Sequence, residues 1–309
     1  MKEQVLIYLK GIAMGGADVV PGVSGGTIAF ITGIYERLLN AINSVNPSTF
    51  QLLLKGDLKA FWEKIDGKFL LPLFAGIATA ILSLAKLMKY LLEAQPILLW
   101  SFFFGLIIVS AIQVGQQVKN WNITTVLALI VGAAFSFYIT LISPAQAPEG
   151  AIYTFIAGAV AICAMILPGI SGAFILLLMG QYKHIMSAIS NFQIETIAIF
   201  ASGCVVGILS FSKVLGFLFK RFHDATVALL TGFMIGSLNK VWPWKEVVET
   251  YVDRHGETKP LVEQNISPFD FQMITGVDNQ LFMAIGLCFL GGFLIFFMQF
   301  AERKLSSRN

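Results

Sequence analysis

Long runs of apolar residues separated by short polar stretches occupy most of this 309-residue chain. A hydrocarbon core of about 30 Å needs roughly 20 consecutive apolar residues of helix. Five runs are long enough to cross it, and a sixth, although shorter, also predicts a span. They cover residues 70–92, 97–118, 123–142, 196–219 and 280–300, with 225–241 as the shorter one. The pattern therefore predicts an all-α polytopic membrane protein.

Two further apolar regions, residues 5–42 and 151–189, are interrupted at their centres by a Pro-Gly-x-Ser-Gly motif. Proline removes a backbone donor and glycine permits unusual dihedral angles, so each motif breaks its helix. Each flank is also short for a full crossing, at about 16 residues. We expect two re-entrant helical hairpins, with tightly packed pairs of short helices as the alternative. The residues that make the breaks are Pro21, Gly22, Pro168 and Gly169.

Charge is scarce, at 13% of the residues. A soluble domain carries about 25%, so this composition excludes a soluble enzyme, a nucleic-acid-binding module and a disordered regulator.

Six spans and two hairpins place both termini on one side. Thirteen lysine and arginine residues, Lys10 among them, fall on that side and six on the other, so both termini should be cytoplasmic. Residues 43–68 then form a cytoplasmic amphipathic segment, and residues 242–278 form the one sizeable external loop.

The chain contains an internal repeat. Residues 20–42 align with residues 167–189 without a gap, and nine of the 23 positions are identical. Similarity resumes downstream, where an Ile-Leu-Ser run, a lysine and two glycines recur. The matching glycines are Gly76 with Gly203 and Gly105 with Gly232.

Each half of the chain is therefore a hairpin followed by three spans. Because three is odd, the second half enters the membrane from the opposite face. We expect two inverted-topology repeats, residues 1–145 and 146–309, that form a single membrane domain. Broken helices in such repeats commonly form a substrate site near the midplane of a transporter. A purely structural duplication, in which the glycines only allow close helix packing, is the alternative.

The residues that follow each break are candidates for binding an anion. Free N–H groups at a helix start, the positive end of the helix dipole and a serine hydroxyl all favour negative charge. Ordinary helix capping by the serines is the alternative. The candidates are Ser24, Gly25, Gly26 and Thr27 in the first half, and Ser171 and Gly172 in the second.

Lys86 and Lys213 lie inside apolar segments at corresponding positions of the two halves. An intramembrane lysine costs about 2.5–3.5 kcal/mol on insertion scales, so the recurrence predicts an anion-binding role. The alternative is that both side chains snorkel to the membrane interface.

Further candidates lie beside the breaks. Tyr35 and Tyr182 recur after them, and Arg37 and His184 follow in equivalent places, where they either contact lipid phosphates or form an interfacial belt. Asp18 precedes the first break and has no acidic counterpart. We expect it either to couple transport to a proton or cation, or to pair with a nearby lysine.

Enzyme motifs are missing from the sequence, which has no Walker loop, no G-x-S-x-G elbow and no HExxH. Its three histidines are scattered, and its three cysteines show no metal-ligand spacing. The sequence therefore predicts neither a catalytic residue, nor a metal site, nor a cofactor.

The opening run KGIAMGGADVVPGVSGGTIAFITGIYERL, residues 10–38, resembles the bacterial polyprenyl-phosphate transporters. The resemblance extends over nearly the whole chain. It implies translocation of undecaprenyl phosphate from the outer to the inner leaflet of the bacterial cytoplasmic (inner) membrane, with that lipid and membrane lipids as partners and no nucleic acid.

Alternating exposure of a phosphate site, coupled to a proton or another cation, is consistent with that substrate. A small-anion transporter or channel is one alternative, and a membrane scaffold whose external loop docks a partner is another. The coupling ion, the oligomeric state and the preference for monophosphate or diphosphate stay open.

Overall fold

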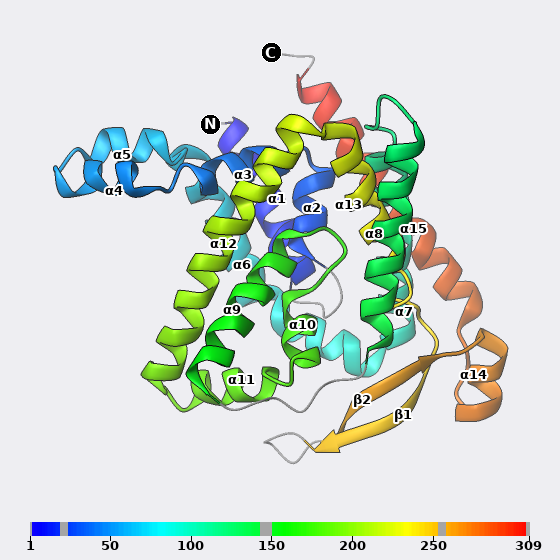
Figure 1. Cartoon of the computed structure of the whole chain (residues 1–309). Coiled ribbons are helices and arrows are strands. Elements are labelled where there is room, and N and C mark those ends of the chain that lie inside the picture. Colours follow the sequence, from blue (N-terminus) through cyan, green and yellow to red (C-terminus); the bar gives the residue numbers. More distant parts are fainter. Residues whose placement is uncertain (1, 19–23, 143–149, 253–257, 307–309) are drawn as a thin grey trace.

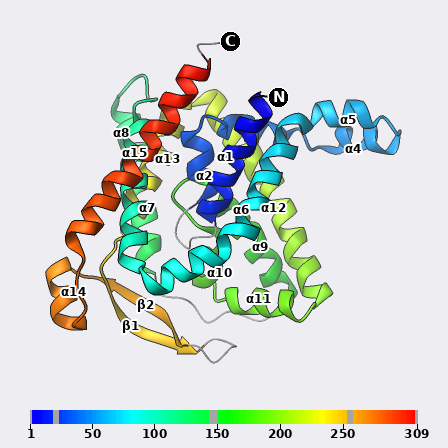
Figure 2. The same cartoon turned by 180° about the vertical axis from the view of Figure 1, so that it is seen from behind.

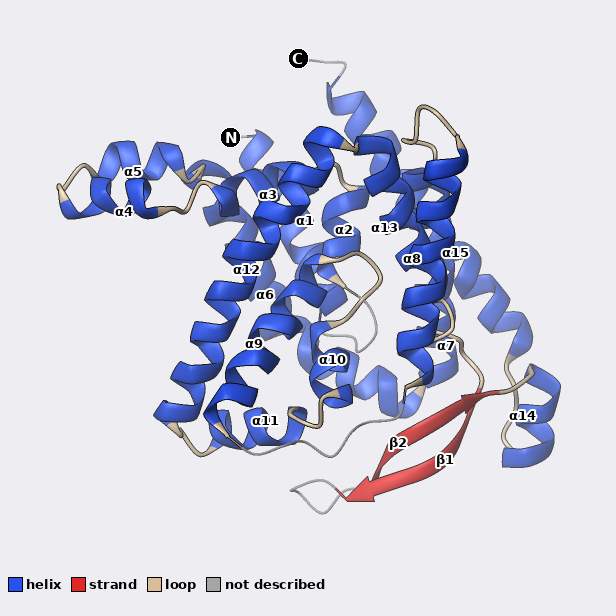
Figure 3. Cartoon of the chain, in the orientation of Figure 1, coloured by secondary structure: helices blue, strands red, loops and turns tan. Residues whose placement is uncertain are grey.

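The computed structural model describes residues 2–18, 24–142, 150–252 and 258–306, and most of these residues are helical (Figure 3). In chain order the elements are α1 (Lys2–Asp18), α2 (Gly25–Ile31), α3 (Tyr35–Asn43), α4 (Pro47–Leu54), α5 (Leu58–Lys64), α6 (Gly67–Ala94), α7 (Pro96–Gly115), α8 (Ile123–Leu141), α9 (Ala151–Ile166), α10 (Gly172–Leu178), α11 (Tyr182–Ser190), α12 (Ile194–Arg221), α13 (His223–Ser237), β1 (Lys245–Val252), β2 (Thr258–Asn265), α14 (Pro268–Thr275) and α15 (Leu281–Ser306).

All six predicted spans are helices, namely α6, α7, α8, α12, α13 and α15. Among the described helices, α6, α7, α8 and α12 are long and apolar enough to cross a membrane. Their outer surfaces carry large apolar side chains, such as Val131 and Tyr138 of α8, and on α15 Phe282 is 90% exposed. Apolar surface on this scale requires hydrocarbon surroundings rather than water. The prediction of a multi-pass membrane protein is therefore confirmed.

The long helices pack in pairs: α1 with α6, α9 with α12, α8 with α13, and α7 with α15. A Cβ atom on Gly76 would overlap a backbone carbonyl of α1, and one on Gly203 would overlap a carbonyl of α9. Gly105 and Gly232 meet backbone carbonyls of α15 and α8 in the same way. Because glycine lets helix backbones approach closely, these four recurring glycines lie at helix crossings.

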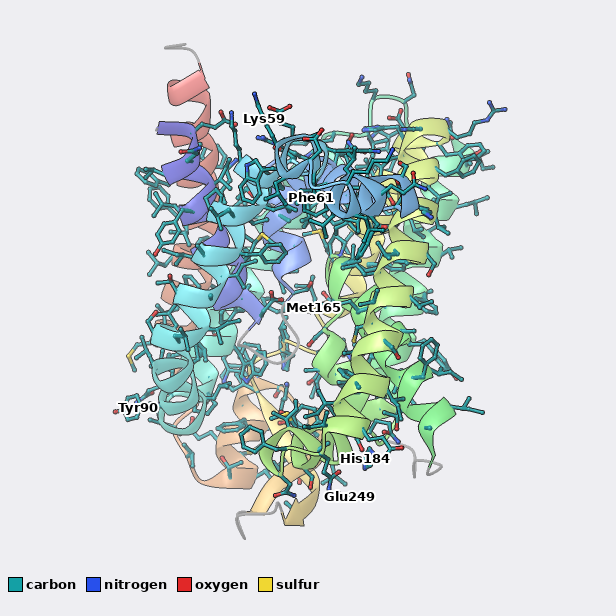
Figure 4. All side chains as sticks on the ribbon, turned by 90° about the vertical axis from the view of Figure 1, so that its left-hand side faces the viewer. Lys59, Phe61, Tyr90, Met165, His184 and Glu249 are labelled. Atoms are coloured by element: carbon teal, nitrogen blue, oxygen red, sulfur yellow. The ribbon has the colours of Figure 1, made fainter. Side chains whose placement is uncertain are left out.

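Two broken helices occupy the middle of the molecule. In Figure 1, α1 begins at the end of the molecule where α15 finishes, which we call the terminal end, and runs inward, and α2 then returns beside it. From the opposite end, α9 runs inward and α10 returns beside it. Met165, near the end of α9, lies midway between the two ends in Figure 4. Every residue of α2 is buried, so the helix that follows the first break lies inside the protein.

A two-stranded antiparallel sheet lies at the end opposite the termini, which we call the strand end (Figure 1). The prediction of an all-α chain is wrong here, because Lys245 pairs with Asn265 and the ladder continues to Val252 and Thr258. The β1 sequence KEVVETYV is rich in valine, threonine and tyrosine, which favour strands. The strands fall within the polar loop that the sequence predicts for residues 242–278.

The predicted amphipathic segment, residues 43–68, contains the helical arm α4–α5, which projects sideways from the body near the terminal end (Figures 1 and 2). Its apolar side chains include Leu54, which is 81% exposed, and Leu58, which is 65% exposed. Lys59 and Phe61 of the arm lie close to the terminal end in Figure 4. An exposed apolar face beside lysines is typical of a helix that lies in a membrane interface.

Candidate functional site

The start of α2, just after the first break, meets the end of α9 and the second break at the centre of the molecule. The Ser24 hydroxyl donates to the carbonyl oxygen of Met165 at 3.0 Å, and the Gly169 amide donates to the Thr27 hydroxyl at 2.9 Å. A Cβ atom on Gly26 would lie 2.5 Å from a carbonyl oxygen of α9. Segments of the two halves, more than 140 positions apart in sequence, therefore form one contact between the breaks.

The backbone donors at the start of α2 already have partners. The Gly25 amide donates to the carboxylate of Asp18 at 2.7 Å, and the Gly26 amide donates to the Ser24 hydroxyl at 3.1 Å. Ser24 is thus the N-cap that the sequence allows. The Asp18 carboxylate thus occupies the place at this helix start where the sequence predicts a bound anion.

Lys10 is a residue of this site whose role the sequence prediction missed. The sequence predicts only a basic residue on the side of the termini, but Lys10 is 7% exposed, and its ammonium group donates to the Thr32 carbonyl oxygen at 2.6 Å. Thr32 is the C-cap of α2. Helix α1 therefore places Asp18 at the positive end of α2 and Lys10 at its negative end. The signal available in the sequence was a lysine inside the apolar run of α1.

The second break forms a turn rather than a second copy of this arrangement. Gly169 adopts φ +83°, which favours glycine, and Pro168 lies beside it in the same turn. Ser171 precedes α10 and is buried, and a Cβ atom on Gly172 would lie 2.6 Å from a carbonyl oxygen of α9. The other two break residues, Pro21 and Gly22, lie outside the described residues.

Comparisons with known proteins identify the family of this chain. Residues 14–259 match the VCA0040-like family model, described as undecaprenyl phosphate translocase-like. A polyprenyl-phosphate transporter of Vibrio cholerae is 49% identical over 280 residues, which is 91% of both chains. Another, from Staphylococcus aureus, is 35% identical over 254 residues, which is 76% of this chain and 85% of that protein. The chain belongs to this family. No solved structure matches it.

Membership of a transporter family confirms that the protein is not an enzyme. In the described ranges of this family member, no cluster of three or more histidine, cysteine, aspartate or glutamate side chains is placed to hold a metal ion.

Two candidates after the first break have protein partners in this family member. Tyr35 is 2% exposed, and its ring lies 5.0 Å from that of Phe30. Its hydroxyl has no hydrogen-bond partner among the residues described. The Arg37 guanidinium contacts the carboxylates of Asp66 at 2.6 Å and Glu3 at 2.9 Å. Arg37 is thus held by acidic side chains near the terminal end, and the ligand role predicted for Tyr35 stays a prediction.

The remaining candidates do not gather at the central contact. His184 is exposed and lies near the strand end in Figure 4, far from Met165. Tyr182 is half-buried at the start of α11, close to His184 in the chain. Lys213 is exposed on α12, and Lys86 lies on α6 with a side chain outside the described residues. The roles of these four residues stay predictions.

Proposed function

We propose that this protein moves undecaprenyl phosphate, or a closely similar polyprenyl phosphate, from the outer to the inner leaflet of the bacterial cytoplasmic membrane. The observation that carries the proposal is the 49% identity to a polyprenyl-phosphate transporter over 91% of both chains. The excess of lysine and arginine on the side of the termini supports a cytoplasmic location for both of them. The direction is that of carrier recycling after cell-wall assembly.

The transport cycle uses two inverted repeats, each with a re-entrant hairpin. Three packing relations support this architecture: the α1–α6 pair corresponds to α9–α12, the α8–α13 pair corresponds to α15–α7, and the recurring glycines lie at these crossings. The two hairpins enter from opposite ends and meet at mid-depth. Rocking of one half against the other then exposes the central contact to each leaflet in turn.

The phosphate headgroup binds at the central contact in place of the Asp18 carboxylate. The Gly25 amide, which donates to that carboxylate, can donate to a phosphate oxygen equally well. The Thr27 hydroxyl, which accepts from the Gly169 amide, can donate its proton to the phosphate, and the Ser24 hydroxyl can do so when it releases the Met165 carbonyl oxygen. The polyprenyl tail stays in lipid. Lys86 and Lys213 extend the site if their side chains reach the headgroup during the cycle.

Exchange of Asp18 for phosphate also provides a route to coupling. Inward movement of an anion opposes an inside-negative potential by about 2.3 kcal/mol per charge per 100 mV. A proton taken up by Asp18 removes the competing carboxylate and offsets that charge. The cycle therefore brings in a proton or another cation together with the lipid phosphate.

The test is transport in proteoliposomes that contain undecaprenyl phosphate in both leaflets. A phosphatase added outside reaches only the outer-leaflet lipid unless a transporter connects the leaflets. Wild-type protein should make the whole pool accessible, and Asp18→Asn should change both the rate and its response to a proton gradient. Protein-free liposomes, in which the inner-leaflet lipid stays protected, are the control. No difference between them and the wild-type proteoliposomes would refute lipid-phosphate transport.

Two further arms address coupling and the rival substrate. If the rate is unchanged when the membrane potential and the proton gradient are collapsed, coupling is refuted. If inorganic phosphate enters the liposomes and undecaprenyl phosphate does not move, the protein is a small-anion transporter instead.

A further inference from the structure

A cavity of about 450 Å³ lies at the strand end, apart from the central contact. Its size is in the usual range for small-molecule sites. One wall is apolar and consists of the last residues of α8 and of Phe174, Leu177 and Leu178 on α10. The opposite wall is polar and comes from the turn after α13 and from both strands. Its charged members are Lys240, Lys245 and Glu263.

The two lysines point at one carboxylate. The Lys240 ammonium group lies 3.5 Å from an oxygen of Glu263, and that of Lys245 lies 3.4 Å from the same oxygen. Each ammonium group also lies over an aromatic ring, Lys240 over Phe174 at 4.7 Å and Lys245 over Trp100 at 4.6 Å. The cluster therefore carries a net charge of +1 and is arranged around an anionic oxygen.

Burial shapes the charge of this cluster. The side chain of Lys245 is 8% exposed, and burial lowers its pKa to about 8, although the Glu263 carboxylate opposes this shift. For Glu263, burial alone would raise the pKa, but the two lysines outweigh it and the pKa is lowered. At neutral pH Lys245 is therefore mainly protonated and Glu263 is ionised.

The surrounding structure fixes the position of the lysines. The Asn239 side chain donates to the Thr140 hydroxyl at 2.7 Å, and the Asn265 side chain donates to the Asn239 carbonyl oxygen at 2.7 Å. The Lys245 ammonium group also donates to the Lys240 carbonyl oxygen at 2.8 Å. These bonds join the end of α8, the turn after α13 and both strands, so the cavity is held in shape before any ligand arrives.

We propose that this cavity receives the phosphate monoester headgroup of a lipid, with the phosphate held between Lys240 and Lys245 in the place of the Glu263 carboxylate. Two ammonium groups that share one carboxylate oxygen can share a phosphate oxygen with the same geometry. The inference rests on the proposed function, because it makes the cavity a capture site that precedes the central contact.

The apolar wall explains why the phosphate would belong to a lipid. Leu141 and Ile142 line the cavity and are 60% and 40% exposed, so they continue onto the outer surface of α8. A prenyl chain attached to a phosphate in the cavity can follow that surface into the membrane. Phe174 lies on α10, the helix that begins at the second break. Seven residues of helix span about 10 Å, so the cavity and the central contact are one short helix apart.

Binding of farnesyl phosphate to the full-length protein in nanodiscs tests this site. Tryptophan fluorescence is the readout, because the Lys245 ammonium group lies over the Trp100 ring. Farnesol and inorganic phosphate are the comparison ligands. Lys240→Gln and Lys245→Gln should each weaken farnesyl phosphate binding at least tenfold. Glu263→Gln should strengthen it several-fold, since it removes the competing charge. Lys220→Gln, an exposed lysine at the end of α12, is the matched control and should leave the affinity unchanged.

Several results would overturn the proposal. One is an equal affinity in the Lys240→Gln and Lys220→Gln proteins. Another is weaker binding in Glu263→Gln, which would make the cluster a purely structural ion pair. Equal binding of inorganic phosphate would refute the lipid assignment. Thermal unfolding of each variant identifies misfolding, and Lys245→Arg, which keeps the charge, should retain binding in a folded protein.

The experiments can refute the proposed capture site without refuting the proposed transport function. If farnesyl phosphate binding does not depend on Lys240 while transport still depends on Asp18, the capture site is wrong and the proposed function stands. If wild-type protein neither binds farnesyl phosphate nor moves undecaprenyl phosphate, both are wrong.

Discussion

The hydrogen bond between Thr27 and Gly169 gives the sharpest test of the central contact. Thr27 is 1% exposed, and its hydroxyl accepts from the Gly169 amide at 2.9 Å. Thr27→Val keeps a similar shape but leaves that buried amide without an acceptor, which costs about 1–3 kcal/mol. This is an approximately 5- to 150-fold increase in the population of states in which the two breaks are apart.

Hydrogen exchange of the Gly169 amide, followed by mass spectrometry in one detergent, measures this population directly. Thr27→Ser is the matched control because it retains the hydroxyl and loses one methyl group, worth about 0.8 kcal/mol or roughly fourfold. The amide should exchange about 5- to 150-fold faster in Thr27→Val than in wild type, and clearly faster than in Thr27→Ser. Identical exchange in the two variants would show that the hydroxyl does not hold the breaks together.

Three other predictions follow from the packing, the charges and the arm. Gly291→Ala should destabilise the protein by about 1–3 kcal/mol, because a Cβ atom there overlaps a carbonyl of α7. Gly286→Ala in the same helix meets no atom within 4 Å and should be neutral or slightly stabilising, and thermal unfolding that shows equal losses would contradict the packing. Farnesyl phosphate affinity should fall up to about tenfold between pH 7 and pH 9 as Lys245 loses its proton, and Lys245→Arg should abolish the fall. Replacing residues 47–64 with a short polar linker should leave the unfolding temperature of the body unchanged and weaken binding to anionic vesicles, and unchanged binding would argue against an interfacial arm.

The sequence is a good guide to the spans because backbone groups in hydrocarbon must be satisfied within a helix. Each apolar run therefore had one available conformation, and all six runs are helices. The two helix breaks can also be predicted from the sequence, because proline and glycine restrict or extend the backbone dihedral angles in known ways. The contact between Thr27 and Gly169 could not be foreseen, because it depends on how deeply each hairpin enters the protein.

Charged residues were the least predictable part. Lys10 looked like one more basic residue near a terminus, and only the return of α2 beside α1 brings the Thr32 carbonyl to it. The capture cavity was missed because Lys240, Lys245 and Glu263 are spread over a turn and two strands of a segment taken for a polar loop. Pairing of β1 with β2 brings together Lys245 and Glu263, which lie 18 positions apart in the sequence.

The placement of Lys10 and Asp18 around α2 has an electrical consequence. With both groups ionised, a negative charge caps the positive end of the helix and a positive charge caps its negative end, so the dipole of α2 is opposed at both ends. The pair sums to zero charge, and a hairpin that moves as a rigid body would therefore displace no net charge through the membrane field. The electrical current of a transport cycle would then arise only from the headgroup and its co-transported ions. The current would therefore give the number of ions moved with each lipid.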